Sequence, residues 1–237
     1  MTDKPDGAQE SGSAEHGQTS TGRAILRGMF GLGLFAIITA GLIALTQLQT
    51  RERIIEQVKL AQSRALFEIV PLSEHDNDLL ADAYWIEAKQ LGLKSPREAY
   101  LAKQGGQVTT LILPVVAPNG YTAPIELIVG INSRGVLEGV RVVQHKETPG
   151  LGDKIETRKS DWIRAFTGKS LANTPDEQWA VKKDGGVFDQ LTGATITPRA
   201  IVSAVHEALK FYQSNRESLL QQAAGSAFQQ EVSDGDA

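Results

Sequence analysis

A run of 23 residues without a charged side chain, Gly28–Thr50, is the strongest constraint in this 237-residue sequence. It reads GMFGLGLFAIITAGLIALTQLQT and has two arginines close to each end. A helix rises 1.5 Å per residue, so about 20 apolar residues span the roughly 30 Å hydrocarbon core of a bilayer. We predict a transmembrane helix over residues 23–50, preceded by a disordered, Gly- and Ser-rich tail at residues 1–22.

A cleaved signal peptide is the main alternative for this run. The preceding polar region is long, the apolar run exceeds a typical h-region, and no clear A-x-A site follows, so we favour a retained anchor. The arginines are balanced across the run, so the positive-inside rule does not give the orientation.

Charge and cysteine content exclude several classes of function. The formal net charge is -4, with 24 Lys+Arg against 28 Asp+Glu, which argues against a nucleic-acid partner. Membrane lipid is an expected partner because of the apolar run. The chain has no cysteine, which excludes disulfides, cysteine-ligated zinc, thiolate-bound iron–sulfur clusters and a thiol nucleophile. Any redox centre must be held by other side chains.

The soluble part is predicted to be one α+β domain. Residues 51–71 have helical apolar spacing up to Pro71 and form a stalk helix. The domain at 72–213 contains an antiparallel sheet with flanking helices. Its last helix starts at Pro198, with Thr197 as N-cap, and ends near Gln213. Residues 214–237 are expected to be a flexible tail. The other predicted elements are strands at 84–86, 99–101, 108–116, 125–131 and 136–143 and short helical pieces at 160–166 and 175–179.

Three threonines just before the last helix form the first candidate site. Thr192, Thr195 and Thr197 offer hydroxyls, while Gly193 and Ala194 leave the backbone accessible. The free N–H groups of a helix start favour an anion, phosphate in particular. The alternative is a threonine-rich turn that only caps the helix.

The second candidate is the loop at residues 147–154, which reads ETPGLGDK. Its two glycines and its proline allow the backbone to lie close to a planar ligand, and Thr148 adds a hydroxyl. The alternative is an ordinary surface turn.

The residues 189–195, DQLTGAT, resemble the D-x-x-(S/T)-G-A-T flavinylation motif of FMN-binding domains, and ETPGLG resembles a second motif of that domain. The longer strings HKETPGLGDKIE, WAVKKDGG and FDQLTGATITPRA resemble the G subunits of Rnf/Rsx ion-translocating electron transport complexes. The resemblance runs from about Arg23 to Tyr212. It implies an inner-membrane protein with a cytoplasmic N-terminus and a periplasmic FMN-binding domain.

The resemblance also implies a role for each matching residue. Thr195 would carry FMN covalently as a phosphoester, and Asp189 would serve the flavin transferase that attaches it. The turn would be formed by Thr192, Gly193 and Ala194, the phosphate cradle by Thr197 and nearby N–H groups, and the ring contact by Thr148, Pro149, Gly150, Leu151 and Gly152.

These roles describe an electron-carrying subunit and not a self-contained catalyst, so no catalytic residue and no metal ligand are expected. The implied partners are the A, B, C, D and E subunits of the complex and the flavin transferase. Two alternatives remain open: the C subunit of the sodium-pumping NADH:quinone reductase, and a membrane-anchored binding or assembly module without a cofactor. Trp85, Trp162 and Trp179 are expected to fill the core.

Overall fold

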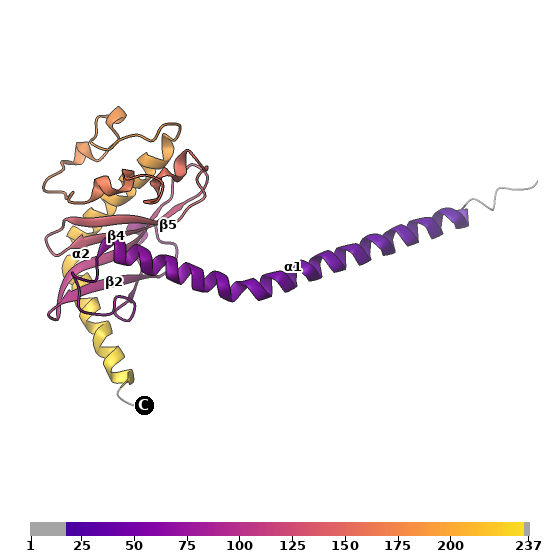
Figure 1. Ribbon diagram of the computed structural model, residues 1–237, viewed down its shortest axis with the longest axis horizontal. Helices are drawn as coiled ribbons and strands as arrows, with labels where there is room; N and C mark the ends of the chain where they lie inside the picture. The colour runs from indigo at the N-terminus through magenta and orange to yellow at the C-terminus, as the bar shows by residue number, and fades with distance from the viewer. Residues whose placement is uncertain (1–17, 235–237) are drawn as a thin grey trace, which may run out of the picture. The chain divides into compact units, whose positions relative to one another are not determined.

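The structure, a computed structural model, describes residues 18–234 (Figure 1). Most of the predicted tail, residues 1–17, lies outside the described residues, as do residues 235–237. The chain divides into two compact units, residues 1–57 and 58–237.

The long N-terminal helix α1 covers Gln18–Ile69, 52 residues. Within it, the 27 residues Ile25–Arg51 have a mean hydropathy of 2.2. No residue of the most apolar 18-residue stretch in this span is buried. At 1.5 Å per residue they extend for about 40 Å, long enough to cross a bilayer. Residues 18–22 are helical, so the predicted tail is shorter than expected.

The second unit is built on a five-stranded antiparallel meander in which neighbours in sequence are neighbours in the sheet. Four predicted strands are confirmed almost to the residue, while the one expected at 99–101 is longer. The strands are β1 (Tyr84–Ile86), β2 (Arg97–Gln104), β3 (Gln107–Ala117), β4 (Ile125–Asn132) and β5 (Leu137–Gln144).

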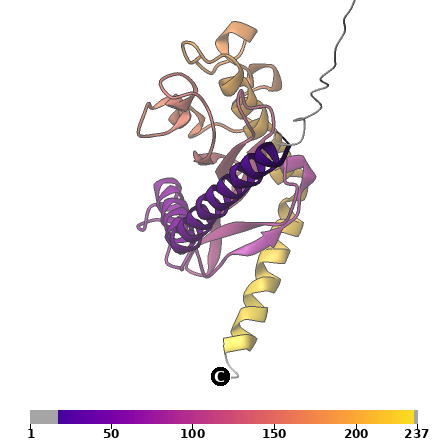
Figure 2. The ribbon, with the colours of Figure 1, turned by 90° about the vertical axis from the view of Figure 1, so that its right-hand side faces the viewer.

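One face of the sheet packs against the C-terminal helix α2, Ile196–Asp234 (Figure 2). Because side chains alternate along a strand, Leu111, Leu113 and Val115 of β3 all face this core. The helix starts two residues before the predicted Pro198 and continues well past the predicted end at Gln213. The Gln- and Ala-rich sequence beyond residue 214 consists largely of good helix formers, which explains the extension.

The opposite face of the sheet is covered by the last turns of α1. Leu66 and Ile69 are buried there against a small cluster that includes Tyr100 and Ile128. Gly130 of β4 lies opposite Gly139 of β5, and a Cβ at Gly130 would come within 2.3 Å of the Ile69 Cγ2. The paired glycines therefore provide the space for Ile69.

The segment between β5 and α2 is mostly irregular and contains four of the five short 3-10 helices. Trp162 and Trp179 are buried there as expected, whereas Trp85 is 67% exposed, which corrects the prediction of three core tryptophans. The Trp162 Nε1 donates to the Asp189 carbonyl at 2.7 Å and so fixes the chain just before the threonine cluster. The 3-10 helices are η1 (Lys89–Leu91), η2 (Gly152–Ile155), η3 (Trp162–Phe166), η4 (Asp176–Gln178) and η5 (Lys182–Asp184).

Candidate functional site

The two candidate segments, about 45 residues apart in sequence, meet around one cavity of about 390 Å³. We call it the threonine pocket. Its lining residues are Tyr121, Glu147, Thr148, Leu151, Gly152, Gly193, Ala194, Thr195, Ile196 and Thr197. The pocket thus brings together residues from both candidate segments and adds Tyr121, which lies outside both.

Thr195 is the exposed hydroxyl at the start of α2. The Ala194 amide donates to the Leu191 carbonyl at 3.0 Å, which closes a tight turn directly before it. Ile196, the next residue, is the first of the helix. The first N–H groups of a helix have no partner within it, so Thr195 directly precedes donors that can bind an anion.

Gly193 allows the two loops to come into contact. Its φ is +83°, in the left-handed region that favours glycine, and a Cβ on it would lie 2.7 Å from the Leu151 Cδ2. A side chain at this position would displace the Leu151 side chain from the turn. The glycine in the motif is therefore required both by its backbone angle and by the contact.

Thr197 does not occupy the predicted N-cap position. Because α2 starts at Ile196, Thr197 lies inside the first turn, and it is fully buried. Its hydroxyl donates a hydrogen bond to the Glu147 Oε2. Its hydroxyl hydrogen is thus committed to a carboxylate.

Four predicted residues lie outside the pocket lining: Pro149, Gly150, Asp189 and Thr192. All four are exposed. The Asp189 carboxylate forms an ion pair with the Lys182 Nζ at 2.5 Å.

Glu147, like Tyr121 and Ile196, is a pocket residue to which the sequence analysis gave no role. It is only 5% exposed, and it accepts hydrogen bonds from the Thr197 hydroxyl and from the Thr122 amide at 3.2 Å. Its own amide donates to the His145 Nδ1 at 3.1 Å, so the His145 Nε2 carries the proton that faces Glu156 at 3.0 Å. Burial acts to raise the pKa of Glu156, but hydrogen bonds from Arg158 and His145 hold that pKa below its usual range. Only the ETPGLG motif itself pointed to Glu147.

Charge in the pocket is sparse. Among its described lining residues there is no lysine or arginine, and Glu147 is the one charged group. Backbone N–H groups and the neutral hydroxyls of Tyr121, Thr148 and Thr195 are therefore the donors available to an anion.

These features fit the FMN that the sequence resemblance implies. The glycine cradle at Gly193 leaves room for close approach, and the Thr195 hydroxyl lies beside the helix start. Leu151 and Ile196, 42% and 46% exposed, and Tyr121, 67% exposed, offer apolar surface for a planar ring.

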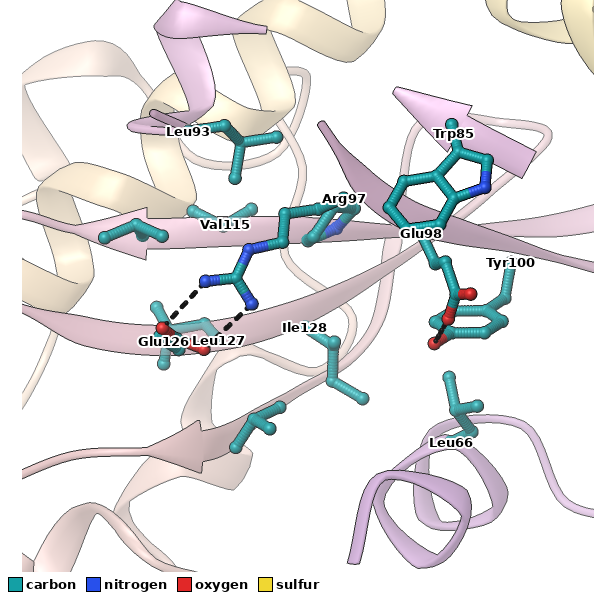
Figure 3. Close-up of a pocket in the computed structure, with 13 residues that line it drawn as sticks. Leu66, Trp85, Leu93, Arg97, Glu98, Tyr100, Val115, Glu126, Leu127 and Ile128 are labelled. Atoms are coloured by element: carbon teal, nitrogen blue, oxygen red, sulfur yellow. Dashed lines mark hydrogen bonds and ion pairs between the residues drawn. The ribbon is translucent and has the colours of Figure 1, made fainter. Parts of the chain in front are cut away.

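A second cavity, of about 240 Å³, lies on the face of the sheet that α1 covers (Figure 3). Its walls include Leu66 and Ile128, and Arg97 and Glu126 form an ion pair at 3.0 Å beside it. Apart from Trp85, which the sequence analysis expected in the core, it contains none of the residues singled out from the sequence.

The comparisons with known proteins agree with this geometry. The FMN-binding domain family matches residues 120–210, which include the whole threonine pocket, and the RnfG N-terminal region matches residues 19–69. The G subunit of the ion-translocating oxidoreductase complex of Pseudomonas aeruginosa is 51% identical over 87% of this chain and 98% of its own length. The G subunits of Shewanella loihica and Vibrio vulnificus are 46% and 44% identical, over 88% and 84% of this chain and 99% and 94% of theirs. With this identity over nearly the whole length of its relatives, the chain belongs to the family of G subunits of ion-translocating oxidoreductase complexes.

Proposed function

We propose that this chain is the electron-carrying subunit of a membrane-bound complex that couples electron transfer to ion translocation, with FMN attached through a phosphoester to Thr195. The observation that carries the proposal is the position of Thr195, an exposed hydroxyl at the start of α2 that opens on the threonine pocket.

Each side of the pocket has a separate part in holding the cofactor. The Thr195 Oγ1 forms the ester, the N–H groups at the start of α2 bind the phosphate oxygens, and Leu151 with its loop lines the ring. The chemistry that FMN supplies when bound is the uptake and release of one or two electrons. No bond of a substrate is broken, so the pocket needs no acid–base pair.

The lack of a cationic lining residue supports a covalent link. A free phosphate monoester carries about −1.5 to −2 charge at neutral pH, whereas a diester has a single ionised oxygen. Helix N–H groups and neutral hydroxyls suit the smaller charge, because hydroxyls carry no net charge and a helix start carries only about +0.5 charge. Esterification also keeps the cofactor on the protein where free FMN is scarce.

The same proposal covers the setting of the protein. The span Ile25–Arg51 anchors it in the bacterial inner membrane, with the N-terminus cytoplasmic and the FMN domain periplasmic. Its partners are the A, B, C, D and E subunits of the complex, membrane lipid, and a flavin transferase that recognises the exposed Asp189. The relatives of this chain are G subunits, so they favour this proposal over the C subunit of the sodium-pumping NADH:quinone reductase.

The covalent link is tested by in-gel flavin fluorescence. The full chain is expressed with and without a flavin transferase and run on a denaturing gel. We expect fluorescence only with the transferase, and its loss in Thr195→Ala.

Thr148→Ala is the matched control, because Thr148 is a second exposed hydroxyl in the same pocket. It should keep the covalent flavin. Fluorescence that persists in Thr195→Ala refutes the assignment, and a dark wild-type chain beside an active transferase supports a module without a cofactor.

A further inference from the structure

The buried carboxylate of Glu147 connects three separate segments at the threonine pocket. Its own loop runs from residue 147 to 152. The Thr122 amide, from the turn between β3 and β4, donates to its Oε1 at 3.2 Å, and the hydroxyl of Thr197 on α2 donates to its Oε2. Removing the carboxylate therefore removes one hydrogen-bonded connection from the 147–152 loop to each of the other two segments.

Two glycines leave room for this carboxylate. A Cβ on Gly152 would lie 2.9 Å from the Glu147 Oε2, and a Cβ on Gly120 would lie 3.2 Å from its Oε1. Neither glycine has a positive φ. The close approach of the carboxylate, together with backbone contacts at Gly120, explains the glycines better than a turn requirement does.

Glu147 also carries a charge that its neighbours do not neutralise. Both of its oxygens accept hydrogen bonds, as in an ionised carboxylate. In the described part of the chain these donors are an amide and a hydroxyl, both neutral. A buried charge with neutral partners is weakly screened, so its field extends into the adjoining pocket.

We propose that Glu147 is the positioning residue of this site, and that its carboxylate both holds the three segments together and lowers the reduction potential of the bound flavin. The inference rests on the proposed function. A negative charge beside the pocket opposes the addition of electrons there, so the reduced state is disfavoured. Since the carboxylate also fixes Thr197, it places the start of α2 against the loop that contacts the ring.

The test is the midpoint potential of the full-length, flavin-loaded protein, measured by dithionite titration with reference dyes. Glu147→Gln preserves size and removes the charge; its amide oxygen can still accept from the Thr122 amide, and the Thr197 hydroxyl can turn to accept from the new NH2 group, so we expect a shift to a more positive potential. The control is Glu98→Gln. Glu98 lies in the second cavity and accepts a hydrogen bond from the Tyr100 hydroxyl at 2.9 Å (Figure 3), so its replacement should leave the potential unchanged.

Thr197→Val separates charge from packing. It keeps the carboxylate but removes one donor, so we expect several-fold lower flavin loading and no positive shift. An unchanged potential in loaded Glu147→Gln, or an equal positive shift in both variants, overturns the proposal. If Glu147→Gln fails to fold, Thr197→Val is the deciding variant. Flavin loading equal to that of the wild-type chain in this variant overturns the proposal. A wild-type chain without covalent flavin refutes the proposed function instead.

Discussion

At the scale of single residues, the contact between Gly193 and Leu151 holds the two loops of the threonine pocket together. Gly193 has a φ of +83° and its missing side chain faces Leu151, whereas Gly150 has a φ of +79° with nothing within 4 Å of its Cβ position. An alanine at either position meets the same backbone strain, but only at position 193 would its Cβ contact another side chain. Comparing the two substitutions therefore separates the cost of the backbone conformation from the cost of the contact with Leu151.

We predict that Gly193→Ala destabilises the domain more than Gly150→Ala and also lowers covalent flavin loading. A non-glycine residue in the left-handed region costs about 1–2 kcal/mol, which is the effect expected for Gly150→Ala. Gly193→Ala also displaces the Leu151 Cδ2 methyl, the end of a 42% exposed side chain, so the additional cost is that of a rotamer change, about 0.5–1.5 kcal/mol. Urea unfolding measures the stability and in-gel fluorescence the loading. Equal losses in both variants would show that the Leu151 contact contributes nothing.

The sequence predicts a residue of this pocket only where the residues that define its role are neighbours in the chain. The D-x-x-T-G-A-T pattern singles out Gly193 and Thr195 because turn, glycine and helix start are adjacent in the chain. The bond between Thr197 and Glu147 joins residues 50 positions apart, and no local pattern indicates it. For the same reason the prediction of Thr197 as the N-cap is wrong, because the sequence does not display its buried partner.

At the scale of elements, the meander was predictable and the helix ends were not. β3 and β4 are β-branched runs that end at Pro-Asn-Gly and Asn-Ser-Arg-Gly turns. Turn sequences of this kind indicate where a strand ends. The docking of α1 on the sheet depends instead on the pairing of Gly130 with Gly139, a register contact that the sequence does not display.

We predict that Gly130→Ala loosens the last turns of α1 from the sheet. The new Cβ would lie 2.3 Å from the Ile69 Cγ2, and overpacking of this kind costs about 1–3 kcal/mol. Gly139→Ala is the matched control, because its Cβ would have nothing closer than 3.4 Å and should have little effect. Both are measured by chemical unfolding of the full chain in detergent.

A double-mutant cycle identifies Ile69 as the cause. Ile69→Ala removes the clashing methyl, so Gly130→Ala should cost less in that background, with a coupling of about 0.5–3 kcal/mol. Strict additivity of the two changes would contradict the contact.

At the scale of the whole molecule, the chain combines a helix long and apolar enough to cross a membrane with a domain that has no thiolate to hold a metal cluster. The FMN-binding family match and the threonine pocket lie in the second unit, residues 58–237, and the span Ile25–Arg51 lies in the first. The position of the apolar helix was predictable because its uncharged run is continuous. The orientation was not, because arginines flank both ends and the positive-inside rule needs an imbalance.

The complete absence of cysteine makes the orientation directly testable. We predict that Ala172→Cys, at an exposed position of the domain, reacts with a membrane-impermeant maleimide in cells whose outer membrane alone is permeabilised. Ser13→Cys, on the N-terminal side of the span, should react only after lysis. The wild-type chain, with no thiol, gives the background of the measurement. The reverse pattern would place the FMN domain in the cytoplasm, and labelling of both sites before lysis would contradict a single crossing through Ile25–Arg51.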